Sequence, residues 1–258
     1  MERYEASTYG ERIASIYDLL YPAGRDAEDA ADFIAGLVAS GAPGGATAGA
    51  PGGGRVLELG IGTGRVALPL AQRGVEIHGI DASESMLAQL RAKPGGDALP
   101  VVLGDFTALA PSEPYAIIFV AFNTFFQLPS QNDQVRCLAS VAEHLAPGGA
   151  FILEAFVPDV CRYDRGQRTA TSLLAGDWVV LESTVHDPVG QKFRTVNVLI
   201  AGDQTRLYPL EARYAWPAEI DLMARLAGLT LEQRWGGWQR EPFTATSERH
   251  VSIYRRPG

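Results

Sequence analysis

A glycine-rich segment follows the short apolar run at residues 55–59, with Glu58 inside the run and glycines at positions 60, 62 and 64. Glycine at this spacing allows a sharp turn and lets a ligand approach the backbone amides without meeting a Cβ atom. A helix-like pattern begins directly afterwards, and the N-terminus of a helix favours anionic or electron-rich groups. The segment therefore predicts a nucleotide-like cofactor bound at a strand-to-helix turn.

Two classes of cofactor are bound at turns of this kind. Residues 62–67 satisfy the dinucleotide pattern G-x-G-x-x-G/A, and Asp81 follows at the distance expected of a carboxylate that binds ribose hydroxyls. The first glycine of that pattern should directly follow the strand, however, and in this chain Gly60 does so. Counted from Gly60, the sixth position is Arg65, which does not fit. The register disfavours a dinucleotide and leaves the pattern E-x-G-x-G-x-G.

The elements around this turn alternate between strand-like and helix-like patterns. Strands are expected at 55–59, 75–80, 100–103, 115–120 and 150–155, with helices at 64–73, 83–93 and 131–146. This alternation is typical of an α/β protein with a doubly wound, Rossmann-like parallel sheet, in which ligands bind at the carboxyl ends of the strands. Acidic or aromatic residues stand at or just after three of those ends: Asp81, Asp105, Phe106 and Phe122.

The pattern changes after residue 158. Four successive strands at 168–174, 177–187, 191–201 and 204–215 are separated by hairpin turns, which predicts an antiparallel β insertion at 159–216. A helix from 217 to 227 and strands near 229–234 and 250–256 return the chain to the main sheet. The insertion follows the fifth strand at the ligand-binding edge, so we expect a substrate cap, an oligomer surface, or both.

The N-terminal residues form a separate helical part. Residues 8–39 carry apolar side chains at helical spacing in two stretches that Pro22 separates, and residues 41–54 are almost entirely Gly, Ala and Pro. We therefore expect a helical lid at 1–40, a linker at 41–54 and a core at 55–158 and 217–258.

Composition narrows the class of partner. The 258 residues carry 30 Asp and Glu against 22 Lys and Arg, and this acidic balance disfavours nucleic acid. There is no apolar segment typical of a signal peptide or a membrane span, so we predict a cytoplasmic protein that acts on a small molecule without a membrane partner. Cys137 and Cys161 are isolated, and the four histidines show no metal-site spacing, so no metal is predicted.

Several motifs together resemble those of class I S-adenosylmethionine-dependent methyltransferases. The glycine turn, Asp81, Gly104-Asp105-Phe106, Ala121-Phe122-Asn123 and Pro147-Gly148-Gly149 occur in the order that this family has. The segment from Tyr9 to Tyr21 resembles the Y-D-x-L-Y helix that closes over the cofactor in small-molecule methyltransferases, including aminosugar and lincosamide N-methyltransferases of antibiotic pathways.

The resemblance implies S-adenosyl-L-methionine as cofactor and a role for each residue. Backbone groups of Gly60 and Gly62 would hold the methionine moiety, with Glu58 supporting the turn, and Asp81 would accept bonds from both ribose hydroxyls. The remaining cofactor contacts implied are the adenine packing of Ala82 and Met86, the adenine amino contact of Asp105, an edge contact of Phe106, and carboxylate contacts of Tyr9 and Arg12. Tyr9, Tyr17 and Phe122 are the candidates that line the catalytic site.

The expected function is methyl transfer to an amine nitrogen of a small natural-product intermediate, by a homo-oligomer formed through the antiparallel insertion. A small-molecule O-methyltransferase is the nearest alternative and would need a better base, for which His186 is the most available candidate. A nicotinamide oxidoreductase and a non-catalytic cofactor-binding protein are more distant alternatives.

Overall fold

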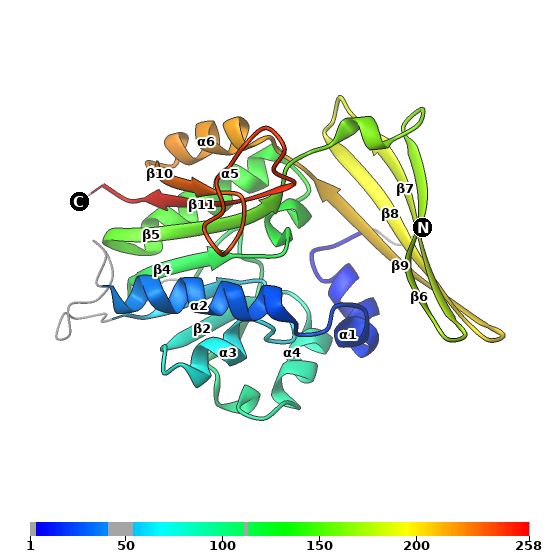
Figure 1. Cartoon of the computed structure of the whole chain (residues 1–258). Coiled ribbons are helices and arrows are strands. Elements are labelled where there is room, and N and C mark those ends of the chain that lie inside the picture. The colour runs from blue at the N-terminus through cyan, green and yellow to red at the C-terminus, as the bar shows by residue number, and fades with distance from the viewer. Residues whose placement is uncertain (1–3, 41–53, 111–112, 258) are drawn as a thin grey trace.

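A computed structural model describes residues 4–40, 54–110 and 113–257, so the predicted linker at 41–54 lies almost wholly outside the described residues. The described part of the chain contains a seven-stranded sheet between two layers of helices and a separate four-stranded sheet that extends away from it (Figure 1). None of its helices is long and apolar enough to cross a membrane.

The seven-stranded sheet has the order β10-β11-β5-β4-β1-β2-β3. Its strands, from one edge to the other, are β10 (Thr230–Trp235), β11 (Arg249–Arg255), β5 (Leu145–Phe156), β4 (Tyr115–Val120), β1 (Val56–Leu59), β2 (Ile77–Asp81) and β3 (Val101–Leu103). The strands from β5 to β3 are parallel, as the alternating sequence predicts. The order reverses at β1, because the chain proceeds outward through β2 and β3 and then returns to β4 on the other side.

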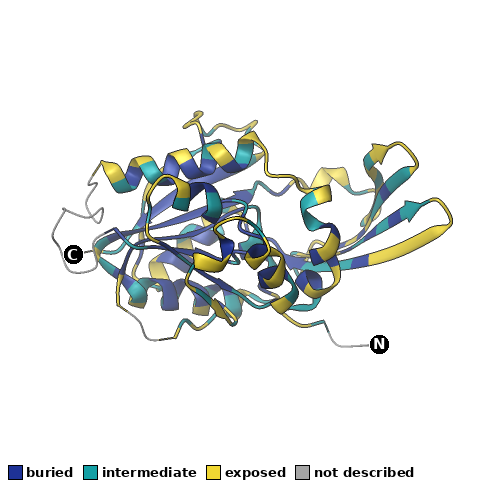
Figure 2. Ribbon diagram, turned by 90° about the horizontal axis from the view of Figure 1, so that it is seen from below, coloured by how far each residue is buried: buried dark blue, intermediate teal, exposed yellow. Residues whose placement is uncertain are grey.

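Two helix layers cover this sheet. Buried side chains of α2 (Arg25–Ala39), α3 (Ala67–Gln72) and α4 (Glu84–Arg91) belong to one apolar cluster, and those of α5 (Gln131–His144) and α6 (Pro217–Leu226) belong to another. Short 3-10 helices occupy three connections: η1 (Gly96–Ala98), η2 (Thr124–Gln127) and η3 (Val160–Arg162). Figure 2 shows buried strands at the centre and helices whose outward faces are exposed.

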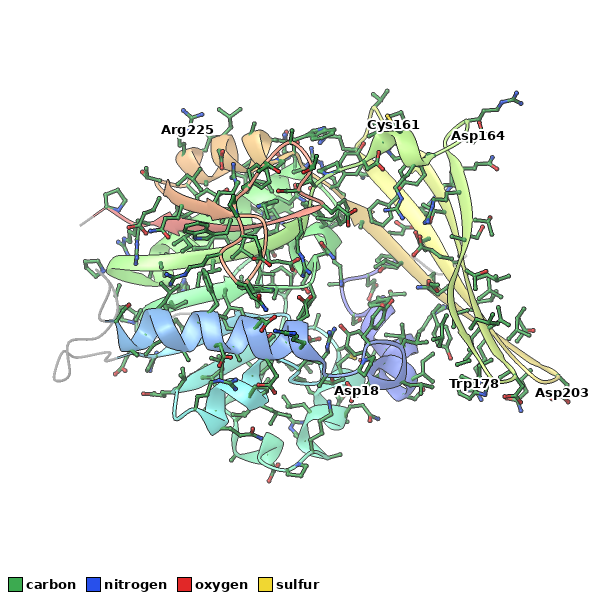
Figure 3. All side chains as sticks on the ribbon, viewed as in Figure 1. Asp18, Cys161, Asp164, Trp178, Asp203 and Arg225 are labelled. Carbon is green, nitrogen blue, oxygen red and sulfur yellow. The ribbon has the colours of Figure 1, made fainter. Side chains whose placement is uncertain are left out.

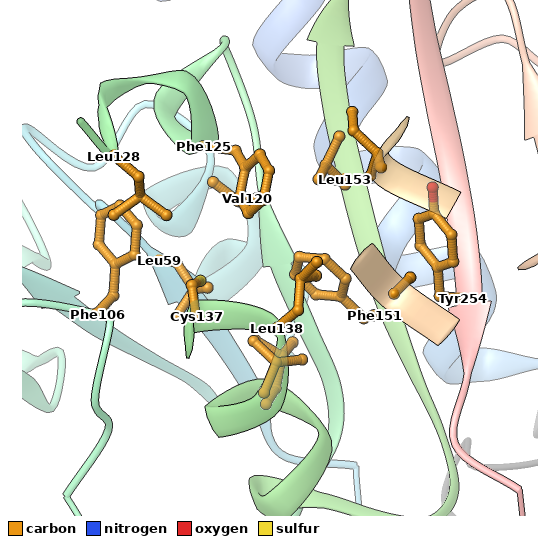
Figure 4. Packing of buried hydrophobic residues seen from close by; sticks show 14 of the residues in the cluster. Leu59, Phe106, Val120, Phe125, Leu128, Cys137, Leu138, Phe151, Leu153 and Tyr254 are labelled. Carbon is orange, nitrogen blue, oxygen red and sulfur yellow. The ribbon is translucent and has the colours of Figure 1, made fainter. Parts of the chain in front are cut away.

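Strand alternation divides the core between the two layers. Ile117 and Phe119 of β4 belong to the cluster on the α2 side, whereas Ile118 and Val120 belong to the cluster on the α5 side. Figure 4 shows Val120 in the second cluster with the α5 residue Leu138. A strand buried on both faces reads as a continuous apolar run, as β4 does.

The insertion forms a four-stranded antiparallel sheet in the order β6-β7-β8-β9. Its strands are β6 (Gln167–Ala175), β7 (Trp178–Asp187), β8 (Lys192–Ala201) and β9 (Gln204–Arg213). Trp178 and Asp203 lie near the tip of this sheet, and Cys161 and Asp164 lie near the opposite end (Figure 3). Helix α1 (Thr8–Leu20) packs Tyr9, Ile13 and Ile16 against this sheet.

Three features differ from the sequence-based expectations. Strand β11 pairs antiparallel with both β5 and β10, so the main sheet is mixed and not wholly parallel. Pro147, Gly148 and Gly149 lie inside β5 as an irregularity, because the pairing with β4 shifts between Tyr115↔Leu145 and Ile117↔Ala150. Helix α3 begins only at Ala67, so the glycine turn is followed by two further turn residues before the helix.

Candidate active site

A cavity of about 250 Å³ opens at the carboxyl ends of the central strands. It lies where the strand order reverses, between β1 and its neighbours β2 and β4, which is the usual ligand-binding position in doubly wound sheets. The structure brings eleven of the twelve predicted site residues to its lining: Tyr9, Tyr17, Glu58, Gly60, Gly62, Asp81, Ala82, Met86, Asp105, Phe106 and Phe122. Arg12 is the exception.

The glycine turn is shaped by left-handed backbone and by close neighbours. Gly60 and Gly62 have φ of +71° and +53°, a region that side chains disfavour. A Cβ atom on Gly60 would lie 2.4 Å from Cγ2 of Thr124, and one on Gly62 would lie 3.2 Å from Cε of Met86. Glycine at these positions therefore allows a tight turn that packs closely against Thr124 and Met86 in the cavity lining.

Asp81 fixes the turn from the end of β2. Its Oδ2 accepts a hydrogen bond of 2.7 Å from the Gly62 amide, and its Oδ1 accepts one of 2.9 Å from the Ser83 amide. Burial raises the pKa of Asp81 above its ordinary value, although these amides act in the opposite direction. The carboxylate thus lies at the cavity wall with its position set by two backbone donors.

Glu58 is a buried carboxylate whose hydrogen bonding is incomplete. The Ala67 amide donates to it, but its Oε2 is buried and has no partner among the described residues. Burial and the neighbouring charge of Asp81 raise its pKa well above the ordinary value. A buried polar atom that faces a cavity without a partner indicates a ligand group that completes it.

Helix α1 closes one side of the cavity and is attached to α4. Oε1 of Glu11 accepts hydrogen bonds from the Ser83 hydroxyl (2.8 Å) and the Ser85 amide (3.1 Å). A Cβ atom on Gly10 would lie 2.5 Å from Cβ of Ser83, so glycine allows this close approach. Burial acts to raise the pKa of Glu11, but the bonds from Ser85 and Ser83 outweigh it and lower that pKa.

Tyr9 and Tyr17 project from α1 into the cavity lining. Burial raises the pKa of Tyr17, against the lowering effect of Arg65, and raises the pKa of Tyr9 well above the ordinary phenol value. Both phenols are therefore protonated at neutral pH. They can orient a ligand through hydrogen bonds, but they are not bases there.

Known proteins resemble this chain in both sequence and structure. The model of the methyltransferase domain family matches residues 56–149. The cypemycin N-terminal methyltransferase from Streptomyces sp is 32% identical over 202 residues, which are 78% of this chain and 82% of that relative. This chain belongs to the methyltransferase family.

Solved structures support the assignment of this chain to the methyltransferase family. The CcbJ methyltransferase from Streptomyces caelestis has a TM-score of 0.88 and 40% sequence identity, and the match covers 99% of this chain and 100% of that one. CalS10, an amino pentose methyltransferase from Micromonospora echinaspora involved in calicheamicin biosynthesis, has a TM-score of 0.69 at 20% identity and covers 93% and 96%. The second match supports the fold alone, and the first covers almost the whole chain, including the four-stranded sheet and the N-terminal helices.

The cofactor predicted from the glycine turn, S-adenosylmethionine, is confirmed by membership of this family. The residues present fit such a group. Gly60 and Gly62 form part of the cavity lining in left-handed backbone, and Oε2 of Glu58 is a buried polar atom without a partner among the described residues. Asp81 offers a fixed carboxylate at the same wall.

Two predicted residues are not at the cavity of the methyltransferase. Arg12 is exposed on α1 and does not line it. His186, the candidate base for hydroxyl acceptors, is buried between Tyr163 and Tyr214 and bonds the Tyr214 hydroxyl at 2.9 Å. No group of His, Cys, Asp and Glu able to hold a metal ion occurs in the described part of the chain.

Arg65 is the guanidinium that the structure places at the cavity, and sequence reasoning assigned it no role. Its Cζ lies 4.2 Å from the centre of the Phe122 ring and 6.0 Å from that of Tyr17, and its Nε is buried without a partner. The sequence could have indicated this role. Arg65 stands just before a helix, where the helix dipole disfavours a positive charge, so its presence there suggests a function other than helix stability.

Proposed function

We propose that this methyltransferase transfers a methyl group from S-adenosylmethionine to an amine nitrogen of a small natural-product intermediate, such as an aminosugar or a lincosamide-like antibiotic precursor. The observation that carries the proposal is the charge of the cavity. Its lining holds six acidic side chains and the single cation Arg65 among the described residues. The acidic residues are Glu5, Glu58, Asp81, Asp105, Asp133 and Glu211. Because burial raises the pKa of Glu58 well above its ordinary value, the other five carry the negative charge of the cavity.

This charge favours a cationic acceptor. Glu58 and Asp81 lie at the glycine turn, where the cofactor is expected, and Asp133 is already paired with Arg136. Glu211 comes from strand β9, where it lies opposite Arg194 of β8 and also lines the cavity. An ammonium group is the acceptor form that such a wall attracts, and it must release one proton, to water or to a carboxylate of the lining, before the neutral amine displaces the methyl group from sulfur.

The proposed chemistry is mainly a matter of position. When bound, the cofactor supplies an electrophilic methyl group for in-line displacement by the acceptor. Tyr9 and Tyr17 would orient the acceptor nitrogen through neutral hydroxyls, and Phe122 would exclude water from the reacting atoms. Orientation of this kind supplies roughly 7–11 kcal/mol in well-aligned reactions.

A nitrogen acceptor also agrees with the residue types of the cavity lining. No histidine lines it among the described residues, and His186 is held in the cap away from it. A hydroxyl acceptor holds its proton more tightly than an ammonium group does, so it would need a stronger base than the deprotonation of an ammonium requires. Similarity to a relative named as an N-terminal methyltransferase supports nitrogen as well.

The proposal includes a role for each cofactor residue. Gly60, Gly62 and Glu58 would hold the methionine moiety, and Asp81 would accept bonds from the ribose hydroxyls. Ala82, Met86, Asp105 and Phe106 would surround the adenine. Arg65 takes the position proposed for Arg12, facing the cofactor carboxylate, because its guanidinium is at the cavity and its Nε lacks a partner.

A labelled-methyl assay tests the acceptor atom directly. The enzyme is incubated with methyl-labelled S-adenosylmethionine and pairs of small molecules that share one scaffold and differ only in an amino or a hydroxyl group. Label on the amine member alone is expected. Label on the hydroxyl member alone would establish O-methylation instead, and tight cofactor binding without transfer to any acceptor would favour a non-catalytic role.

We also propose that residues 1–40 act as a lid, residues 159–216 as a cap on the core at 55–158 and 217–258, and that the cap forms a homo-oligomer. Val180 and Leu199 face α1, so by alternation the adjacent Leu181 and Val198, which pair with each other, face outward. Leu207, opposite Val198, has 57% of its surface exposed. A second copy would cover this apolar face.

The oligomer proposal is tested by Val198→Lys, which places a charge in the centre of the outward face. Monomers are expected in sedimentation velocity, with unchanged circular dichroism. Val189→Lys is the matched control, because Val189 lies in a hairpin turn and is 93% exposed. If Val198→Lys sediments like the unmodified protein, the outward face is not the interface.

A further inference from the structure

The loop after β4 contains two consecutive left-handed residues that are not glycine. Phe122 has φ of 54° and Asn123 has φ of 65°. Asparagine tolerates this region, but phenylalanine is rarely found there, and such backbone persists only where its surroundings hold it. The question is what holds this turn at the wall of the cavity.

The carboxylate of Glu154 holds it. Oε2 of Glu154 accepts a hydrogen bond of 2.5 Å from the Phe122 amide, and the Asn123 amide also donates to the carboxylate. On the other side of the turn, Oδ1 of Asn123 accepts a bond of 2.7 Å from the Phe156 amide. With Phe122 and Asn123 in left-handed backbone, their two successive amides both point at this one carboxylate.

A carboxylate at the position of Glu154 is unfavourable for the stability of the fold. Glu154 lies near the carboxyl end of β5 with 3% of its surface exposed, and it does not line the cavity. The charged groups that face it are Asp26 of α2 and Arg249 of β11, which pair with each other. A charge taken out of water is unfavourable, and apolar side chains often fill such positions at no loss of stability.

The backbone of this turn determines where two side chains of the cavity lining lie. The Phe122 ring lies in the lining, and the guanidinium of Arg65 stacks on it at 4.2 Å. Arg65 in turn reaches Tyr17 of the lid, with a side-chain hydrogen bond between them. A change in the backbone at Phe122 would therefore move one ring and one guanidinium at the cavity.

We propose that Glu154 is a positioning residue of this methyltransferase, which holds Phe122 and Asn123 in left-handed backbone and thereby places the Phe122 ring and the Arg65 guanidinium at the cofactor cavity. It acts only through Phe122 and never touches a ligand. The inference holds whichever atom of the acceptor is methylated.

The test uses S-adenosylhomocysteine as the probe and calorimetry as the measurement. Phe122→Ala is expected to weaken binding by about 3- to 10-fold through loss of the ring that orders Arg65. Glu154→Ala should weaken the binding of S-adenosylhomocysteine by a similar factor, although Glu154 lies outside the cavity. Glu154→Gln keeps an acceptor oxygen and should weaken this binding less. The double variant should bind no more weakly than Phe122→Ala, because two residues that act through one contact are not additive.

Val251→Ala is the matched control for stability. Val251 pairs with Glu154 across β5 and β11, is buried, and has no polar side-chain atom that could accept the hydrogen bonds of the turn. Its melting temperature should fall while its affinity for the probe stays unchanged. An affinity of Glu154→Ala equal to that of the unmodified protein, or additive losses in the double variant, would overturn the proposal and leave Glu154 a structural residue.

Discussion

The Thr63 hydroxyl in the glycine turn donates a hydrogen bond of 2.6 Å to Oδ1 of Asp18 in α1. Nζ of Lys93 lies 2.6 Å from the other oxygen of the same carboxylate and also donates to the Thr63 carbonyl at 2.8 Å. Figure 3 shows Asp18 on the side of α1 that faces the main sheet unit. One carboxylate thus attaches helix α1 to the glycine turn and to Lys93.

Replacement of Asp18 by Asn should loosen this attachment. The contacts are partly exposed, so we expect the dissociation rate of S-adenosylhomocysteine to rise by about threefold to tenfold, more at low salt than at high salt. Stopped-flow displacement measures this rate. Glu232→Gln, which breaks the ion pair with Arg255 between β10 and β11, is the control and should leave it unchanged. An unaltered rate in Asp18→Asn would show that the lid is held by other contacts.

Replacement of Gly60 by Ala should destabilise the protein by two separable effects. The left-handed backbone costs about 1–2 kcal/mol for a residue with Cβ, and the clash with Cγ2 of Thr124 adds about 1–3 kcal/mol. Urea denaturation gives the sum. Thr124→Ser removes Cγ2, so the double variant should recover the second part only. Equal stability of Gly60→Ala with and without Thr124→Ser would contradict the clash.

Replacement of Asp81 by Ala should weaken cofactor binding by about 1–3 kcal/mol, as expected for a lost charge-assisted contact. The Gly62 and Ser83 amides would also lose their acceptor, so some loss of stability accompanies it. Calorimetry with S-adenosylmethionine measures the affinity at a temperature where the variant is folded. An affinity equal to that of the unmodified protein would remove Asp81 from the binding site.

The titration of Glu154 should make stability depend on pH. Burial raises the pKa of Glu154 from its ordinary value of 4.5 to about 7, so the folded protein holds this proton more tightly than the unfolded chain does. Its contribution is fully present below pH 4.5 and is lost as pH rises through about 7, an amount on the order of 3 kcal/mol.

The comparison with Glu154→Gln isolates this effect, since glutamine does not titrate. Urea unfolding of both proteins at pH 5, 6, 7 and 8 should show the variant gaining stability relative to the unmodified protein as pH rises. Contributions of other groups cancel in the difference. A difference that stays constant across this range would show that the Glu154 pKa is not raised.

Local patterns sufficed to predict most elements and the position of the cavity. The glycine turn and Asp81 stand within 21 residues of each other, and strand periodicity fixes which ends meet at one edge. The antiparallel direction of β11 has no local signal, because one strand pattern fits either direction. It is set by the long connection from β10, which returns the chain beside β5.

Contacts of long range explain what sequence reasoning missed. Arg12 stands five residues before Tyr17, which turns it about 140° away from Tyr17 around the helix and leaves it exposed. The contacts of Asp18 and Glu11 with Thr63, Ser83 and Ser85 span 45 to 74 residues. For Glu154 a signal was present, since a carboxylate within an apolar strand is unfavourable there and needs hydrogen-bond donors around it.

Helix α1 contacts two parts of the molecule, one on each side. Tyr9, Ile13 and Ile16 pack against Val180, Leu199 and Tyr208 of the cap, while Gly10, Glu11 and Asp18 contact the segments around the cofactor. The helix cannot move aside for the donor without also taking Tyr9 from the acceptor side. If the surroundings of the acceptor are complete only once the donor is enclosed, we expect the donor to bind first, the acceptor second, and the methylated product to leave before the spent donor.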